Sequence, residues 1–259
     1  MNPQQHNLTR TWAAHRVHIY VGCVIFGIFV TLIPLLGVGL GYFSPATTYW
    51  VWGVLDYVVL LVPLATAWWD APGENRTTLE RAFEFTMIWF PVTASSQITW
   101  ETPWMTLDRL GPMHGAGPQN HWLWLWWGYG AADSRYLTSD PGLLGMELVA
   151  ILGGCILLVA FIKLFKARRE HNEEKLIRPL WVAFFCMSMM LAVVTIYFAS
   201  EGFAGFADIH EGFWGFAYKF IFMNIWWLIV PLIALPFTYK IISYLYKSTL
   251  TKTIDQRSG

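Results

Sequence analysis

Apolar runs long enough to cross a membrane constrain this chain more than any other feature of its sequence. A hydrocarbon core about 30 Å thick is crossed by roughly 20 mostly apolar residues of helix. Six such runs occur, at residues 17–41, 48–69, 82–100, 142–162, 179–200 and 213–239. The second contains Asp56, and the third contains Glu84, Pro91 and Gln97. The runs predict an all-α fold, a polytopic membrane helix bundle with six transmembrane helices.

Composition agrees with this class and excludes others. Hydrophobic residues make up 56% of the chain and charged residues 13%, whereas soluble domains carry about 25% charged residues. The 16 Trp suit a membrane interface. The net charge is zero, whereas nucleic-acid-binding proteins usually carry an excess of positive charge. No nucleic-acid partner is therefore expected. Neither the three cysteines nor His114, His121 and His210 show metal-ligand spacing, so no metal is expected.

The distribution of Lys and Arg predicts the orientation of the bundle, because these residues collect in cytosolic segments. With the N-terminus in the cytosol, fourteen of the 17 Lys and Arg fall in inner segments. Only Arg109 and Arg135 fall in outer segments, and Lys219 lies within a span. We therefore expect both termini in the cytosol. The membrane is expected to be the endoplasmic reticulum of a eukaryote or the inner membrane of a bacterium.

The spans also divide the chain into parts. Residues 1–47 are expected to form a cytosolic N-terminus and a first transmembrane helix, residues 48–240 a membrane domain, and residues 241–259 a cytosolic tail. The outer loop at residues 101–141 contains HWLWLWWGYG, which is too short for another span and suits the outer interface. We expect this loop to cap the bundle.

Polar side chains within the spans mark candidate functional positions, because an ionisable group in hydrocarbon costs about 2.5–3.5 kcal/mol on insertion scales. Glu147 lies in the fourth run, and Glu101 ends the third, one helical turn after Gln97. Asn224 and Trp227 share a face of the sixth. Together they predict a pocket among three helices. The alternatives are that Glu101 faces interfacial water, that Asn224 joins helices, and that Glu147 is purely structural.

Asp56 and Lys219 lie at similar depths in the second and sixth runs. Opposite charges within a membrane commonly pair with one another. We expect these two to form an ion pair between the spans.

Four strings resemble a known family in order and spacing: GYGAADSRYLTSD, GMELVAILGG, IYFASEGFAGF and FMNIWWLIVP. The most specific parts are DSRY at residues 133–136, Met146 and Glu147 ten and eleven residues after its Tyr, and FMNxxW at residues 222–227. These parts resemble the emopamil-binding protein family of sterol isomerases, whose shared unit is the EXPERA domain. The resemblance covers about residues 48–240. It implies the five-helix bundle of that family with one extra helix, residues 17–41, in front.

The resemblance implies a cavity that takes a sterol or another polycyclic lipid from the bilayer. The family moves a ring double bond from C8=C9 to C7=C8, protonating one carbon and deprotonating a neighbour, without metal or redox cofactor. Carboxylates and an indole suit the intermediate carbocation. The implied catalytic positions are Glu101, Glu147, Asn224 and Trp227. The implied substrate-binding positions are Gln97, Tyr136, Ala150, Met146 and Met223.

This chain departs from the family pattern at positions near the implied site. Gln97 stands where the isomerases have a His, and an amide cannot titrate near neutral pH. Ala150 replaces the usual Thr, and Lys219 stands where an aromatic residue is expected. The resemblance, with these departures, implies an isomerase for a sterol or related terpenoid, with a noncatalytic sterol- or lipid-binding membrane protein as the alternative. A subunit that serves only the assembly of a membrane complex is a more remote alternative, and a homodimer stays open.

Overall fold

The structure is a computed structural model that describes residues 6–258, except for the side chains of residues 252, 253 and 255–258. Within this part the chain is helical and forms no strand, which confirms the predicted all-α fold. The long helices are α1 (Ala14–Gly39), α2 (Pro45–Trp68), α3 (Thr78–Ser96), α6 (Pro141–Arg169), α7 (Ile177–Phe203) and α9 (Met223–Ser258).

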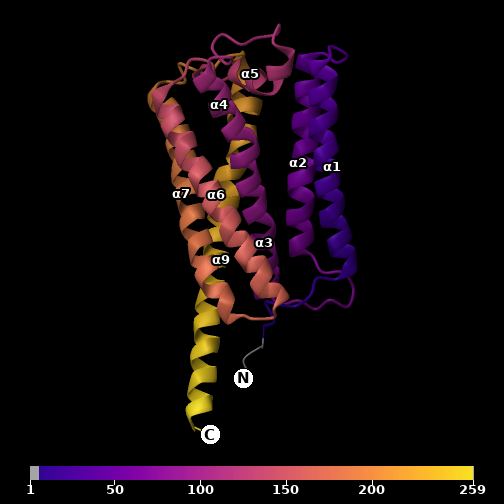
Figure 1. The fold of residues 1–259 in the computed structure, drawn as a ribbon, viewed down its shortest axis with the longest axis vertical. Helices are drawn as coiled ribbons and strands as arrows, with labels where there is room; N and C mark the ends of the chain where they lie inside the picture. Colours follow the sequence, from indigo (N-terminus) through magenta and orange to yellow (C-terminus); the bar gives the residue numbers. More distant parts are fainter. Residues whose placement is uncertain (1–5, 259) are drawn as a thin grey trace.

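Short helical segments connect and extend these helices. The α-helical ones are α4 (Thr102–Leu110), α5 (Trp124–Gly130) and α8 (Gly212–Trp214). The 3₁₀ segments are η2 (His121–Leu123), η3 (Ser134–Tyr136) and η4 (Glu174–Leu176), and the π-helical segments are η1 (Gln97–Glu101) and η5 (Gly215–Phe222). As Figure 1 shows, α4 and α5 lie at one end of the bundle, here called the α5 end. The first described residues and the end of α9 lie at the opposite end.

Five helical stretches are long and apolar enough to cross a membrane: Ala14–Gly39, Pro45–Trp68, Pro141–Arg169, Glu174–Phe203 and Gly212–Thr251. They have the length and composition of a multi-pass membrane protein. The third predicted span is a helix, α3, but it is not among the five. Its first turns carry Glu80, Arg81 and Glu84, and it is surrounded by protein, packing against α2, α6 and α9. Because its sides face protein, α3 does not need the apolar surface that lipid requires.

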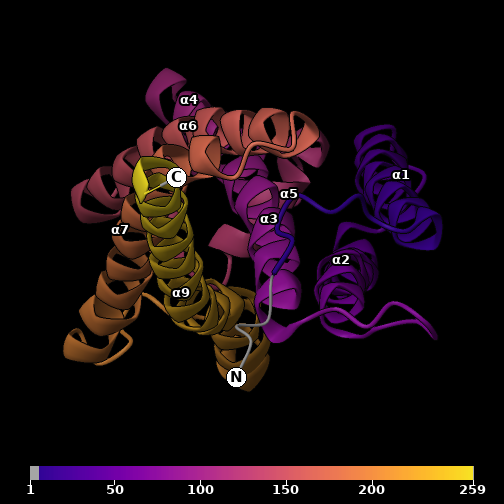
Figure 2. The ribbon, with the colours of Figure 1, turned by 90° about the horizontal axis from the view of Figure 1, so that it is seen from below.

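The helices form two groups (Figure 2). One is the pair α1 and α2, and the other contains α3, α6, α7 and α9. The pair joins the larger group through contacts of α2 with α3, and through α5 and η2 at the α5 end. Much of α1 is exposed, as Val24 and Phe29 show at 63% and 56%. A helix with such a surface presents its apolar side chains to lipid.

Buried apolar residues form two clusters, one toward each end. The cluster at the α5 end is rich in aromatic side chains, among them Tyr49, Trp52, Trp104 and Trp124. Trp124, from the predicted interfacial loop, is fully buried against Tyr49 and Trp52. The loop at residues 101–141 therefore closes this end of the bundle by inserting aromatic rings between the helices.

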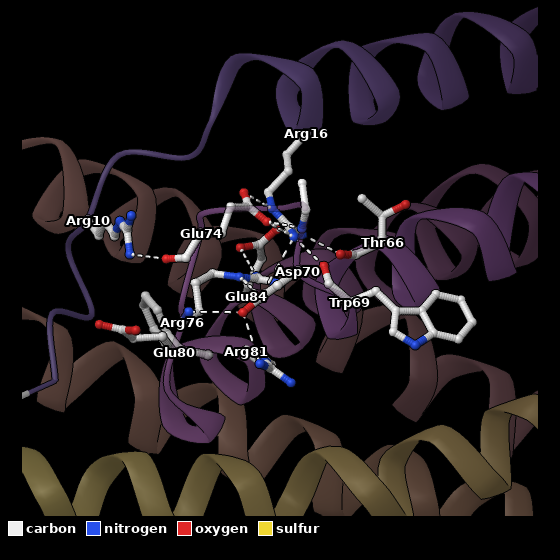
Figure 3. Close-up of polar contacts among 12 residues, drawn as sticks. Arg10, Arg16, Thr66, Trp69, Asp70, Glu74, Arg76, Glu80, Arg81 and Glu84 are labelled. Carbon is white, nitrogen blue, oxygen red and sulfur yellow. Dashed lines mark hydrogen bonds and ion pairs between the residues drawn. The ribbon is translucent and has the colours of Figure 1, made fainter. Parts of the chain in front are cut away.

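A network of charged groups, several of them buried, attaches α1 to the connection between α2 and α3 at the opposite end (Figure 3). We call it the Arg16–Glu84 cluster; its members are Arg16, Tyr20, Asp70, Glu74, Arg76, Arg81 and Glu84. Hydrogen bonds from Arg16 hold the pKa of Glu74 down at about 2. Glu74 therefore stays ionised at any pH near neutrality. From the sequence, the three arginines contributed only to the predicted orientation, because folding alone brings the members of the cluster together.

Candidate functional site

The first wall of the site is the junction of α3 with η1. Thr93 lies in the last part of α3, and Gln97 and Glu101 begin and end η1. A π turn is wider than an α turn, and such turns occur frequently at functional sites. Close approach of α6 sets the place of Gln97, because a Cβ atom at Gly154 would lie only 2.7 Å from that of Gln97. Gly154 therefore leaves the space that η1 occupies.

The second wall comes from η3 and α6. The Asp133 side chain accepts a hydrogen bond from the backbone N–H of Arg135, and Asp140 caps α6 by accepting one from Leu143. These caps set Tyr136 directly before α6. The Tyr136 hydroxyl donates a hydrogen bond to Glu147 Oε1 over 2.9 Å. Two elements joined by a short loop thus orient one carboxyl group.

The third wall is the start of α9, directly after the π-helical η5. Asn224 Nδ2 donates to the hydroxyl of Tyr129 over 2.6 Å and to the carbonyl of Phe220 over 2.8 Å. The first bond joins α9 to α5, as expected of an amide that links helices. Trp227 lies one turn further on, 5.2 Å from the ring of Trp89 on α3.

Two adjoining cavities lie between these walls. The larger, of about 350 Å³, is bounded by α1, α2, α3, η1, α5, η3 and α9; its volume falls in the range of small-molecule sites, about 300–1,000 Å³. The smaller, of about 60 Å³, reaches toward α6 and α7. The residues shared by both are Ser96, Glu101, Tyr136, Asn224 and Trp227.

The structure places every predicted site residue on these cavity walls. Four line both cavities: Glu101, Tyr136, Asn224 and Trp227. The smaller cavity alone is lined by Gln97, Met146, Glu147 and Ala150, and the larger alone by Met223. Residues from four parts of the sequence therefore meet at one place near the α5 end.

A pair of carboxyl groups forms the centre of the site. Glu101 and Glu147 are 9% and 8% exposed, so Glu101 does not face open water at the end of its helix. Both side chains line the same small cavity of about 60 Å³, so the two carboxyl groups lie close together. Two carboxylates at such a separation repel each other, and a pair of this kind is most stable when it holds one proton.

Several buried polar atoms around the cavities have no hydrogen-bond partner among the residues that the structure describes. They are Glu101 Oε2, Gln97 Oε1 and Thr93 Oγ1, together with the indole nitrogens of Trp52 and Trp226. Leaving such an atom unpaired costs about 1–3 kcal/mol. All five residues line one of the two cavities, so a polar ligand group or water there would find partners.

A hydrogen-bonded chain that sequence reasoning missed supports Asn224 from behind. The Tyr129 hydroxyl, which accepts from Asn224, lies 2.7 Å from that of Tyr197, and Tyr197 donates to Asp133 over 2.7 Å. Arg135 holds Asp133 through two hydrogen bonds. Burial raises the pKa of Tyr129 well above its ordinary value, so its phenol keeps its proton. Tyr129 and Tyr197 lie in two of the strings quoted for the family resemblance, but the sequence alone does not show that they contact each other.

Aromatic rings that the sequence did not single out wall the larger cavity. Trp52 of α2 and Trp100 of η1 stack with centroids 5.6 Å apart and an angle of 9° between the rings. Both line the larger cavity, and Tyr57 and Trp226 line it as well. These rings give the cavity a largely apolar surface around its few polar groups, which suits a rigid lipid better than a hydrophilic substrate.

The expected ion pair between Asp56 and Lys219 is wrong. Lys219 Nζ instead donates to Glu211 and to the carbonyl of Gly128. Asp56 lines the larger cavity and makes no hydrogen bond or ion pair with any residue that the structure describes. Similar depth does not settle pairing, because the rotation of each helix decides where a side chain points. Lys219 is also absent from both cavity walls, so it adds no cation to the site.

No group of three or more His, Cys, Asp or Glu residues in the described part of the chain is arranged to hold a metal ion. In comparisons with protein-family models, with curated proteins and with solved structures, nothing matched the chain.

Proposed function

We propose that this protein is an intramolecular isomerase that moves a carbon–carbon double bond in a sterol or related terpenoid. The observation that carries the proposal is the buried Glu101–Glu147 carboxyl pair on a cavity lined by Trp227 and Asn224. A pair holding one proton contains both an acid and a base. It therefore has the two groups that a double-bond shift needs.

The reaction balances without a co-reactant. One carboxyl group gives its proton to an alkene carbon, which leaves a carbocation on the other carbon of the double bond. A carboxylate then removes a proton from the next carbon, and the electrons of that C–H bond form the new double bond. The product is an isomer, and the pair again holds one proton. The Trp227 indole would stabilise the cation through its ring face, as in other cation–π contacts.

The tyrosine and asparagine have supporting roles in this proposal. Tyr136 donates to Glu147 Oε1, which orients that carboxyl group and stabilises it when it is ionised. Asn224 is held by Tyr129 and Phe220, so its carbonyl oxygen can face the cavity that it lines. The resemblance to the emopamil-binding protein family supplies the reaction class, and the cavity supplies a place for the substrate.

A second candidate, a noncatalytic sterol- or lipid-binding protein, is favoured by Gln97. Its amide lines the smaller cavity where a titratable group would otherwise help to move protons, and its Oε1 has no partner. An amide acceptor of this kind suits a ligand hydroxyl. A binder would keep the cavity and its polar atoms but would not turn over its ligand.

Expression in yeast that lacks its sterol isomerase tests the first function against the second. We expect the wild-type chain to convert the accumulated sterol or an added terpenoid, giving a product of the same mass with a shifted double bond. Lipid extraction followed by mass spectrometry and chromatography against both isomers measures this. Binding without conversion of any member of a broad panel would favour the noncatalytic function.

We also propose six membrane crossings with both termini in the cytosol. Figure 1 supports this, because the first described residues and the end of α9 lie at one end, which requires an even number of crossings. On this proposal α3 and η1 together form the sixth crossing, although α3 is not among the five apolar stretches. The excess of Lys and Arg at the same end gives the orientation. The proposed membrane is the endoplasmic reticulum of a eukaryote or the inner membrane of a bacterium.

We predict that epitope tags at both termini are accessible from the cytosolic side of sealed vesicles, whereas a cysteine introduced at the exposed Gln119 is not. Protease protection and an impermeant thiol reagent measure the two results. A protected N-terminal tag with an accessible C-terminal tag would contradict the even number of crossings.

A further inference from the structure

A groove distinct from the candidate site lies at the opposite end of the bundle, between the start of α1 and the end of α6. We call it the α1–α6 groove; its volume is about 460 Å³, and it is lined by Thr9, Thr11, Trp12, Val17, Tyr20, Val21, Phe165, Arg168, Arg169 and His171. Its basic residues follow directly after the apolar part of α6. The groove therefore lies where a membrane span meets the polar headgroup region.

Arg168 is the feature that points to a ligand. It is only 8% exposed, and its guanidinium stacks on the ring of Trp12 with Cζ 3.9 Å from the centroid. Its Nη2 donates to the carbonyl of Arg10, but its buried Nε has no hydrogen-bond partner. Among the described residues no carboxylate forms an ion pair with it. Burying a cation without a counter-ion costs free energy. An anion bound in the groove would therefore be stabilised by the charge of Arg168.

The acidic residues nearby do not supply this anion. Glu84 forms ion pairs with Arg16 and Arg76 in the Arg16–Glu84 cluster. Glu170 pairs with Lys166 and Lys175 and is not part of the groove. Glu173 accepts a hydrogen bond from the backbone N–H of Leu8, beside the groove. None of these three carboxylates forms an ion pair with Arg168, which leaves a place for an anion from outside the described chain.

Further basic groups lie on the wall of the same groove. Arg169 and His171 are exposed there, and Arg169 forms no ion pair with any described residue. An arginine pair can hold a phosphate group through several charge-assisted hydrogen bonds.

The rest of the groove is apolar and faces outward. Val17, Val21 and Phe165 are 39%, 50% and 42% exposed and continue from the basic rim along α1 and α6. A free phosphate would leave this surface uncovered, whereas a phospholipid has an anionic head joined to acyl chains. Charge and apolar surface together therefore select an amphiphile.

We propose that the α1–α6 groove binds an anionic phospholipid. Arg168 and Arg169 hold the phosphate, and Val17, Val21 and Phe165 lie against the acyl chains. Because α1 reaches the rest of the bundle mainly through α2, a lipid seated between α1 and α6 would also join the two helix groups. The proposal does not depend on the reaction at the candidate site.

The experiment is native mass spectrometry of the purified full chain in mild detergent, with dioleoylphosphatidic acid or dioleoylphosphatidylcholine added at equal concentrations. We expect one tightly held phosphatidic acid and weaker phosphatidylcholine binding. Because hydrogen bonds to charged groups are worth about 1.5–3 kcal/mol, Arg169→Gln should weaken phosphatidic acid binding by about tenfold or more. Arg168→Gln should do the same, and Arg168→Lys should restore part of the binding.

The matched control is Arg178→Gln, which removes an exposed arginine near the start of α7, outside the groove. It should leave binding unchanged. Should Arg168→Gln fail to fold, Arg169→Gln tests the site by itself, because Arg169 is exposed and forms no ion pair with any described residue. Equal binding of the two lipids, or equal effects of Arg169→Gln and Arg178→Gln, would overturn the proposal. Thermal stabilisation by inorganic phosphate that matches phosphatidic acid would overturn the lipid as occupant.

Discussion

Replacing Glu147 by Gln is expected to lower turnover by about 10²–10⁴-fold, the usual cost of losing one positioned general acid or base. Gln has nearly the same shape and still accepts the hydrogen bond that Tyr136 donates to Oε1. It cannot share a proton with Glu101 or take one from a carbocation. The measurement is the initial rate of isomer formation by purified protein, compared with the wild type at saturating substrate.

Two controls separate chemistry from folding. Glu174→Gln changes an exposed glutamate in η4, far along the chain from the cavities, and should leave turnover unchanged. Thermal unfolding of Glu147→Gln should show a folded protein. Turnover by Glu147→Gln at the wild-type rate would contradict the catalytic role of this carboxyl group.

Ligand affinity distinguishes an isomerase from a binder when turnover is absent. A noncatalytic site should bind a neutral sterol equally well with Glu147 or with Gln at this position. A cationic amine would lose affinity in Glu147→Gln, because only the amine needs the carboxylate. Trp227→Leu should also weaken amines more than sterols, by about 0.5–2 kcal/mol, through the lost cation–π attraction.

The parts of this fold that sequence predicts are those set by local pattern. Apolar runs of about 20 residues became long helices, as the run at 142–162 did within α6. Spacing along a helix also placed Asn224 and Trp227 on one cavity wall, because both lie in a regular α-helix after η5. The low hydropathy of α3 can also be read from its own residues. Its cause does not appear in the sequence, because it is the position of α3 among other helices.

The parts that sequence does not predict depend on rotation and on distant partners. Glu101 and Gln97 lie in a π-helical segment, whose wider turn no 3.6-residue pattern reveals. Lys219 also lies in a π segment and turns toward Glu211 rather than Asp56. Tyr129 and Tyr197 meet across 68 residues of sequence. In each case the sequence shows how far along its helix a residue lies. The packing of the helices decides to which side its side chain points.

Replacing Glu84 by Gln is expected to destabilise the protein by about 3–5 kcal/mol, the range found when one partner of a buried ion pair is removed. Glu84 is 2% exposed and receives Arg16 Nη1 at 3.3 Å and Arg76 Nη1 at 2.7 Å. Tyr20 donates to it as well. Gln has no charge to neutralise either guanidinium. Its amide N–H₂ group would also point at an arginine N–H, so two donors would face each other. Thermal and denaturant unfolding in detergent measure the loss.

The effect should fall mainly on the attachment of α1, because Arg16 and Tyr20 both belong to that helix and α1 has few other partners in the larger helix group. Limited proteolysis should therefore cut the connection between α2 and α3 faster in Glu84→Gln than in the wild type. Glu170→Gln is the control, since Glu170 forms its ion pairs with Lys166 and Lys175 on an exposed surface, and it should change stability little. Equal unfolding of the two variants would mean that the Arg16–Glu84 cluster does not hold α1 in place.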